Sequence, residues 1–321
     1  MKQIIILFFI VLSSVAVSQV IPEKRDTTVL MSKLELLNSM SSSTSLSYEM
    51  NLVEKYPSVD VNAQNIDYLR LGLISTVTLG SGLAVHIYQA NAWWKDQRTP
   101  FKIVNDWEYA LWIDKIGHFY ATSLLQHAFS AALEGAGFNL ENSAWIGAGT
   151  ALGYQLFIEI EDGFGPQWGF SPGDAVFDLL GASYPVFQHY YPFLKNFQMK
   201  FSYYPVDLNK VSPKSGQRHI MIDDYSGQKF WLSFRMKNLL PYEIAKIWPS
   251  WLALAVGYGV KNLDGSGGGQ KDVYIAMDLD LEALPLHGKT WGFIKNTLNY
   301  AHFPMPGIRI TNNVAFFGLC Y

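Results

Sequence analysis

The hydrophobic pattern of the sequence changes its period near Lys200, and this change limits the folds that the chain can adopt. Before Lys200 the sequence contains long segments without charged residues, which are typical of helices that are buried or in contact with lipid. After Lys200, apolar residues alternate with small or polar residues in residues 230–236, 252–260, 273–281 and 307–321. Such alternation is typical of strands whose two faces meet different surroundings. The sequence therefore predicts an α+β protein, in which a helical bundle that could be membrane-embedded precedes a small antiparallel β-sheet region.

The longest uncharged segment runs from Leu71 to Trp94. It is long enough to cross a hydrocarbon core of about 30 Å as a helix, and it predicts a transmembrane helix. A buried helix of a soluble bundle is the alternative, because His86 and several Ser and Thr residues reduce the apolar character of the segment. Three shorter uncharged segments follow, and each is compatible with a short membrane helix, a re-entrant segment or an inner helix of a compact bundle: residues 116–133, 142–158 and 179–194.

The first 18 residues predict an export signal. Lys2 supplies a positive start, residues 4–12 form an apolar stretch too short to span a bilayer, and small residues precede a cleavage site near Ser18. An uncleaved anchor is the alternative. Residues 19–64 are predicted to be a polar, weakly structured lead-in, residues 65–200 the helical core, and residues 201–321 the antiparallel β region.

Composition excludes two classes of protein. The chain carries 24 Lys and Arg against 27 Asp and Glu, so its net charge of −3 gives no basic surface for nucleic acid. Charged residues make up 16% and aromatic residues 15% of the chain, which excludes intrinsic disorder. Cys320 is the only cysteine, so neither an intrachain disulfide nor a cysteine-based metal site can form.

Acidic and histidine side chains at helical spacing mark the region from Asp114 to Gly181. Asp114 and His118 are four residues apart, so a helix places the carboxylate and the imidazole on one face. This pair can share a proton, hold a divalent cation or simply orient two helices through a hydrogen bond.

A second group follows in Gln155, Glu159 and Asp162, which lie on one stripe of a helix. Burying a lone carboxylate in an apolar helix is costly, which makes Glu159 the most informative acid in the chain. Alternatively, Glu159 lies at the solvated end of its helix.

A third group begins with Ser171, which is predicted to be the N-cap of a helix that has Pro172 in its first turn. Asp174, three residues after Ser171, is predicted to complete a capping box. Capping accounts for Asp174, whereas Asp178, one turn later, either faces the same cluster or lies at the edge of the bundle.

Taken together, these residues resemble domain of unknown function 2279, a bacterial envelope family that includes the YfiM-type periplasmic lipoproteins. The resemblance covers about residues 105–195, and more distantly the order of these residues is similar to VanZ-like membrane proteins. The motifs that carry it are Asp114-Lys115 with His118, Tyr154-Gln155 with Glu159 and Asp162-Gly163, and Trp168 to Ser171 with Asp174 and Gly181.

The resemblance implies an envelope location and a helical core, and it implies no established activity. The chain lacks the lipobox cysteine that the lipoprotein members have at the end of the export signal, so its anchoring must differ. It also has Asp178 where related sequences often have Asn.

Two functions remain open from the sequence. The first is a membrane-associated envelope protein without enzymatic activity, which contacts membrane lipid or envelope protein partners and in which the acids and His118 form a buried polar network. The second is a membrane-embedded hydrolase or transferase acting on lipid-linked or cell-wall material, with His118 as general base, Glu159 as proton donor or metal ligand and Asp114 orienting His118. The candidate catalytic residues are His118, Asp114, Glu159 and Asp174. The candidate metal ligands are Asp114, His118, Glu159 and Asp162, and no cofactor can be named.

Overall fold

The computed structural model describes residues 65–92, 98–211 and 218–321. The predicted export signal and the polar lead-in up to residue 64 lie outside the described residues, as do Trp93 and Trp94 at the end of the uncharged segment. The described part combines seven α-helices with a six-stranded antiparallel sheet, which confirms the predicted α+β class. Four helices are long, namely α4 (Tyr68–Ala92), α5 (Ile113–Gly135), α6 (Leu140–Gly163) and α7 (Pro172–Tyr190), and three are short, namely α8 (Met236–Leu239), α9 (Tyr242–Ile247) and α10 (Lys289–Leu298).

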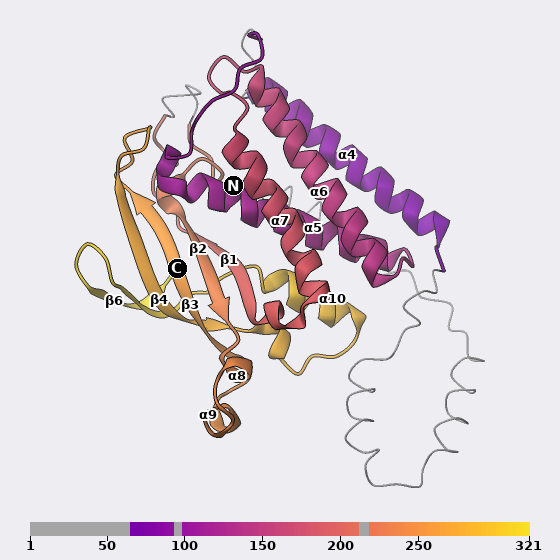
Figure 1. The fold of residues 1–321 in the computed structure, drawn as a ribbon, viewed down its shortest axis with the longest axis vertical. Coiled ribbons are helices and arrows are strands. Elements are labelled where there is room, and N and C mark those ends of the chain that lie inside the picture. Colours follow the sequence, from indigo (N-terminus) through magenta and orange to yellow (C-terminus); the bar gives the residue numbers. More distant parts are fainter. Residues whose placement is uncertain (1–64, 93–97, 212–217) are drawn as a thin grey trace.

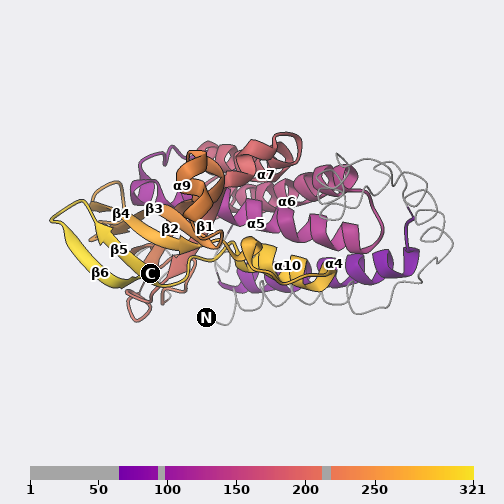
Figure 2. The ribbon, with the colours of Figure 1, turned by 90° about the horizontal axis from the view of Figure 1, so that it is seen from below.

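Helix α5 is the central helix of the bundle, with α6 and α7 packed against it and α4 beside α6 (Figures 1 and 2). Two glycines permit the close contacts: a Cβ on Gly181 of α7 would lie 2.3 Å from the backbone oxygen of Phe119, and a Cβ on Gly147 of α6 would lie 2.5 Å from Ser130 Oγ. Helix α4 meets α6 where the rings of His86 and Phe157 lie 5.2 Å apart.

Capping residues fix where the bundle helices begin. Asn139 Oδ1 accepts a hydrogen bond from the amide of Asn142 at the start of α6, and Ser171 Oγ accepts one from the amide of Asp174 at the start of α7. The predicted cap at Ser171 is therefore confirmed. Asp174 does not return the hydrogen bond of a capping box, because the Ser171 amide donates to Glu159 instead.

No helix among the described residues is long and apolar enough to cross a membrane. Helix α4 is the described part of the segment in which a transmembrane helix was predicted, and polar residues such as Thr76, Thr78, Ser81 and Asn91 lower its mean hydropathy. The prediction of a transmembrane helix is therefore not supported.

The sheet follows the order of the chain, and each strand pairs with the next. Its strands are β1 (Phe197–Tyr203), β2 (Gln228–Phe234), β3 (Leu252–Lys261), β4 (Gln270–Leu279), β5 (Met305–Arg309) and β6 (Ala315–Cys320). Helix α5 packs on one face of β1, β2 and β3 (Figure 1). There the ring of Tyr120 lies 5.5 Å from that of Phe201 and 5.6 Å from that of Phe230.

The opposite face of the sheet holds a buried ionic group, formed by Lys200, Asp278 and His302. Lys200 Nζ lies 2.8 Å from Asp278 Oδ2, and His302 Nδ1 lies 3.0 Å from Asp278 Oδ1. Trp231, which is fully buried, stacks on His302 at 3.9 Å between ring centroids. These partners satisfy the charges and hydrogen-bonding groups that this face buries.

Candidate functional site

The chain enters α5 through an unusual backbone conformation. Ala110, Leu111 and Trp112 all have positive φ angles of 49°, 55° and 76°. Residues other than glycine rarely adopt this left-handed conformation, which costs roughly 1 kcal/mol for each residue. Two contacts with the β region hold the turn: the Ala110 amide donates to the Ser266 carbonyl, and Tyr258 Oη donates to the Leu111 carbonyl. The turn places Asp114, Lys115 and His118 on the first two turns of α5.

Lys115 is the buried cation of the site and has no solvent exposure. Its Nζ lies 2.9 Å from Asp106 Oδ2, 2.9 Å from Asp174 Oδ1 and 3.4 Å from Asp114 Oδ2. Asp106 also accepts a hydrogen bond from Ser171 Oγ at 2.6 Å. Lys115 therefore joins α5, the start of α7 and the segment before α5 through one ammonium group.

His118 lies one turn further along α5, and its Nδ1 is 3.1 Å from Asp178 Oδ1. The same oxygen accepts hydrogen bonds from Thr122 Oγ1 at 2.7 Å and Gln155 Nε2 at 3.3 Å. Because a carboxylate can only accept, this arrangement favours a proton on His118 Nδ1. Through this hydrogen bond the fully buried Asp178 fixes the orientation of the His118 ring. In the sequence-based prediction this role belonged to Asp114.

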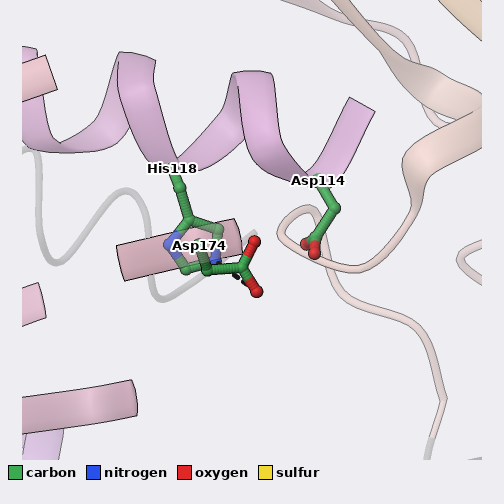
Figure 3. Close-up of side chains that lie close together, drawn as sticks. All are labelled: Asp114, His118 and Asp174. Atoms are coloured by element: carbon green, nitrogen blue, oxygen red, sulfur yellow. Dashed lines mark ion pairs between the residues drawn. The ribbon is translucent and has the colours of Figure 1, made fainter. Parts of the chain in front are cut away.

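The other ring nitrogen of His118 faces two carboxylates. His118 Nε2 lies 3.8 Å from Glu159 Oε1 and 3.9 Å from Asp174 Oδ2. Figure 3 shows Asp114 and His118 projecting from one side of α5 towards Asp174. Ligand atoms of Asp114, His118 and Asp174 all lie within 4.8 Å of one another, as do those of His118, Glu159 and Asp178.

Burial and neighbouring charges shift the pKa values of the group in opposite directions. Burial raises the pKa of Glu159 to about 9, and the nearby Asp174 and Asp162 add to this effect. Burial likewise raises the pKa of Asp174 to about 6, with a contribution from Asp114. Burial alone would lower the pKa of His118, but the hydrogen bond to Asp178 and the charges of Asp174, Asp178 and Asp114 hold it well above its usual value.

The pKa of Asp114 is shifted in the opposite direction to those of Glu159 and Asp174. Burial would raise its pKa, but the charges of His118 and Lys115 and the hydrogen bond from Tyr225 Oη, at 2.6 Å, lower it. Tyr225 belongs to the β region, so the site also fastens the bundle to the sheet.

The structure brings together the four candidate catalytic residues Asp114, His118, Glu159 and Asp174. Glu159 is buried and does not lie at a solvated helix end. Asp162, a candidate metal ligand, lies outside both groups of clustered ligand atoms. The roles of general base and proton donor stay predictions.

Sequence reasoning missed the central position of Lys115 and the part played by Asp106. The helix spacing that pairs Asp114 with His118 gives no signal for Lys115, since adjacent residues on a helix point in different directions. The sequence does contain a signal for the burial of Lys115, however, because α5 has no other lysine and no arginine. A buried lysine needs acidic partners, and both Asp174 and Asp106 were available in the sequence.

With this geometry established, comparison with known proteins adds one match. Residues 104–190 match the family described as predicted periplasmic lipoprotein (DUF2279). The predicted resemblance is therefore confirmed for this segment, which contains every residue of the site except Tyr225. The match supports an exported protein of the cell envelope. No curated protein and no solved structure matches the chain, and the similarity to VanZ-like proteins stays a prediction.

Proposed function

We propose that the protein is a membrane-associated protein of the cell envelope without enzymatic activity, which places the exposed apolar face of its sheet against a lipid bilayer. In this role the Asp/His/Glu cluster is an internal polar network that fixes how the helices and the sheet pack. A single observation carries the proposal, namely an apolar row that crosses the whole sheet.

The apolar row consists of cross-strand neighbours, one from each strand: Met199, Leu232, Val256, Ile275, Ile308 and Phe316. Val256 is 43% exposed, Ile275 42% and Phe316 72%. Leu232 and Ile308 are half-buried, and Met199 at the β1 end of the row packs in the cluster that α5 covers. An apolar hollow of about 310 Å³ marks where this cover ends. The row carries no charge across six strands.

The opposite face of the same strands is buried and rich in polar residues. It includes Gln198, Lys200, Ser202, Ser233, Asp272 and Asp278. A sheet with one solvated face normally directs its polar residues outward. Apolar residues outward and polar residues inward are instead the arrangement of strands that face lipid.

The bundle supports the same proposal. Its outer surface has large exposed apolar residues on α6 and α7, and no charged residue is exposed on α6 between Glu141 and Glu161. These exposed residues are Trp145, Ile146, Phe157 and Ile160 on α6, and Val176, Leu179, Leu180 and Phe187 on α7. Apolar patches of this extent are rare on proteins that contact only water.

Aromatic side chains with polar tips lie at one end of this helical surface. Trp145 Nε1 donates to Tyr190 Oη at 2.9 Å, and both side chains are exposed. Tyr191, which is also exposed, continues the group beyond α7. Trp and Tyr are enriched where proteins meet the boundary between lipid and water, which favours a bilayer as the occupant of the apolar surface.

Vesicle binding of the full chain tests the proposal. The triple variant Val256→Asn, Ile275→Asn, Phe316→Ser removes three apolar side chains from the row and is expected to weaken partitioning into phospholipid vesicles by about 10- to 100-fold. Because these side chains are exposed, the thermal stability of the variant should stay close to that of the wild type. The matched control is Ile247→Asn on α9, which is 81% exposed and lies outside the sheet. Unchanged vesicle binding by the triple variant, or an equal loss in the control, contradicts the proposal.

A further inference from the structure

Two largely buried acidic residues of the site each direct one carboxylate oxygen towards His118 Nε2 from beyond hydrogen-bonding distance. Glu159 is 3% exposed, and the nearest polar atom given for its Oε1 is His118 Nε2 at 3.8 Å. Asp174 is 5% exposed, and its Oδ2 faces the same nitrogen at 3.9 Å. Both separations exceed the length of a hydrogen bond. The other oxygen of each group is bound, Glu159 Oε2 by the Ser171 amide and Asp174 Oδ1 by Lys115 Nζ, so one oxygen of each carboxyl group is left to face the imidazole.

Neighbouring side chains hold the imidazole in the way they do around metal sites. Asp178 accepts a hydrogen bond from Nδ1–H of His118, and Thr122 and Gln155 donate hydrogen bonds to Asp178 in turn. Once a metal displaces the Nε2 proton, the lone pair of this nitrogen points away from Asp178 towards the other carboxylates. A carboxylate that orients a histidine in this manner is a recurrent feature around histidine metal ligands.

Negative charge exceeds positive charge in the site. Four carboxylate groups, those of Asp106, Asp114, Asp174 and Asp178, surround one lysine and one histidine. Lys115 offsets one of these charges, and an imidazolium would offset a second. A divalent cation would reduce the remaining charge further, at a place where burial makes unpaired charge costly.

We propose that Asp114, His118 Nε2 and Asp174 bind a divalent transition-metal cation, with Glu159 beside the remaining coordination position. The ligand atoms of these three residues lie within 4.8 Å of one another, so closure around a cation with bonds of about 2.0–2.2 Å needs side-chain movements of about 1 Å or less. Asp178 is a positioning residue, since it acts through the ring of His118.

The donor set indicates the class of cation. One imidazole with two carboxylates suits Zn²⁺ or a neighbouring first-row metal, whereas Mg²⁺ and Ca²⁺ prefer oxygen donors alone. The side chains of His118 and Asp114 are 22% and 13% exposed, which gives a cation a route from solvent. The site is independent of the apolar row, so metal binding and vesicle binding can fail separately.

Metal titration of the full chain tests the proposal. After treatment with EDTA, the wild type is expected to bind one equivalent of Zn²⁺ in competition with a chromophoric chelator. His118→Asn and Asp174→Asn are expected to lower the affinity at least 100-fold, and Asp178→Asn 10- to 100-fold. The matched controls are His189→Asn, a histidine on α7 outside the cluster, and Glu161→Gln, which lies two residues from Glu159 and pairs with Arg98. Both controls should bind Zn²⁺ as the wild type does.

A second measurement needs no variant and therefore does not depend on how the substitutions fold. Zinc K-edge X-ray absorption of the loaded wild type should show one imidazole nitrogen together with oxygen ligands. Absence of stoichiometric binding, a spectrum without imidazole, or equal losses of affinity in His118→Asn and His189→Asn would each overturn the proposal.

Discussion

At the scale of single residues, two of the buried charged groups in the described part of the chain are built around a lysine that is surrounded by acceptors. Lys115 joins three acidic side chains at the end of the bundle, and Lys200 joins Asp278, the Leu279 carbonyl and Asn299 inside the sheet. Buried groups of this kind stabilise a fold only when every member has a partner. They also make stability depend on pH wherever a member titrates.

Asp278 is expected to make the protein sensitive to acid between about pH 4 and pH 2. Burial alone would raise its pKa, but the hydrogen bond with His302 and the charge of Lys200 lower it to about 2, from 3.8 in a model peptide. A lowered pKa stabilises the folded state above the unfolded pKa, and this contribution, on the order of 2 kcal/mol, is lost as the pH falls through the folded pKa. Urea unfolding at a series of pH values measures it. Asp278→Asn should be less stable at pH 6 and lose less stability between pH 4 and pH 2. Equal losses in both proteins would contradict the assignment.

The sequence predicted the site better than it predicted the partners within it. The spacing of Asp114 and His118, and the cost of burying Glu159, were enough to predict a shared cluster, because both depend on one helix and on solvation. The hydrogen bond between His118 and Asp178 depends on how α7 crosses α5, which helical spacing does not specify. For this reason the sequence placed Asp178 either in the cluster or at the edge of the bundle. It gave the role of orienting His118 to Asp114.

At the scale of secondary-structure elements, that crossing depends on one glycine. Gly181 brings α7 against the backbone of α5 at Phe119, within one turn of both His118 and Thr122. A larger residue at this position would separate the two helices. The hydrogen bonds of Asp178 to His118 and Thr122 would then lengthen.

Gly181→Ala is expected to destabilise the protein by about 1–3 kcal/mol, because its Cβ would lie 2.3 Å from the Phe119 carbonyl oxygen and the backbone must move. The free energy of unfolding from urea titration measures this loss. Gly153→Ala is the matched control, since Gly153 also lies within a helix and its Cβ would meet no atom within 4 Å. Ala is favoured over Gly at such a position by about 0.5–1 kcal/mol, so the control should be at least as stable as the wild type. A stable Gly181→Ala variant would show that the crossing tolerates a side chain.

At the scale of the whole molecule, the sequence predicted strands β2, β3 and β4, missed β1 and gave β5 and β6 as one segment. It did not predict which face of the sheet is enclosed. Period-two alternation in residues 252–260 and 273–281 indicates two unlike faces and is silent about what covers them. The usual expectation places the apolar face inside, whereas here Lys200, Asp278 and His302 are inside and Val256 and Ile275 are outside. The enclosed polar group joins Lys200 to Asp278, 78 positions along the chain, and Asp278 to His302, a further 24 positions along, and no local pattern predicts such pairing.

Helix α5 belongs to the cores of both the bundle and the sheet, so the two are expected to unfold together. Phe230 of β2 is 4% exposed and packs on Gly117 and Tyr120 of α5, and Phe230→Ala should cost about 3–5 kcal/mol. Hydrogen exchange followed by mass spectrometry measures in which helices and strands the amide protection decreases. If the cores are shared, protection falls by a similar free energy in α5, α6 and α7 as in β2 and β3. Tyr242→Ala on α9, where the side chain is 76% exposed, should change neither region by more than about 0.5 kcal/mol. Helices that keep their protection while the strands lose theirs would show that the bundle is stable without the sheet, and the contacts of Tyr225 and Tyr120 would then be those of two separate domains.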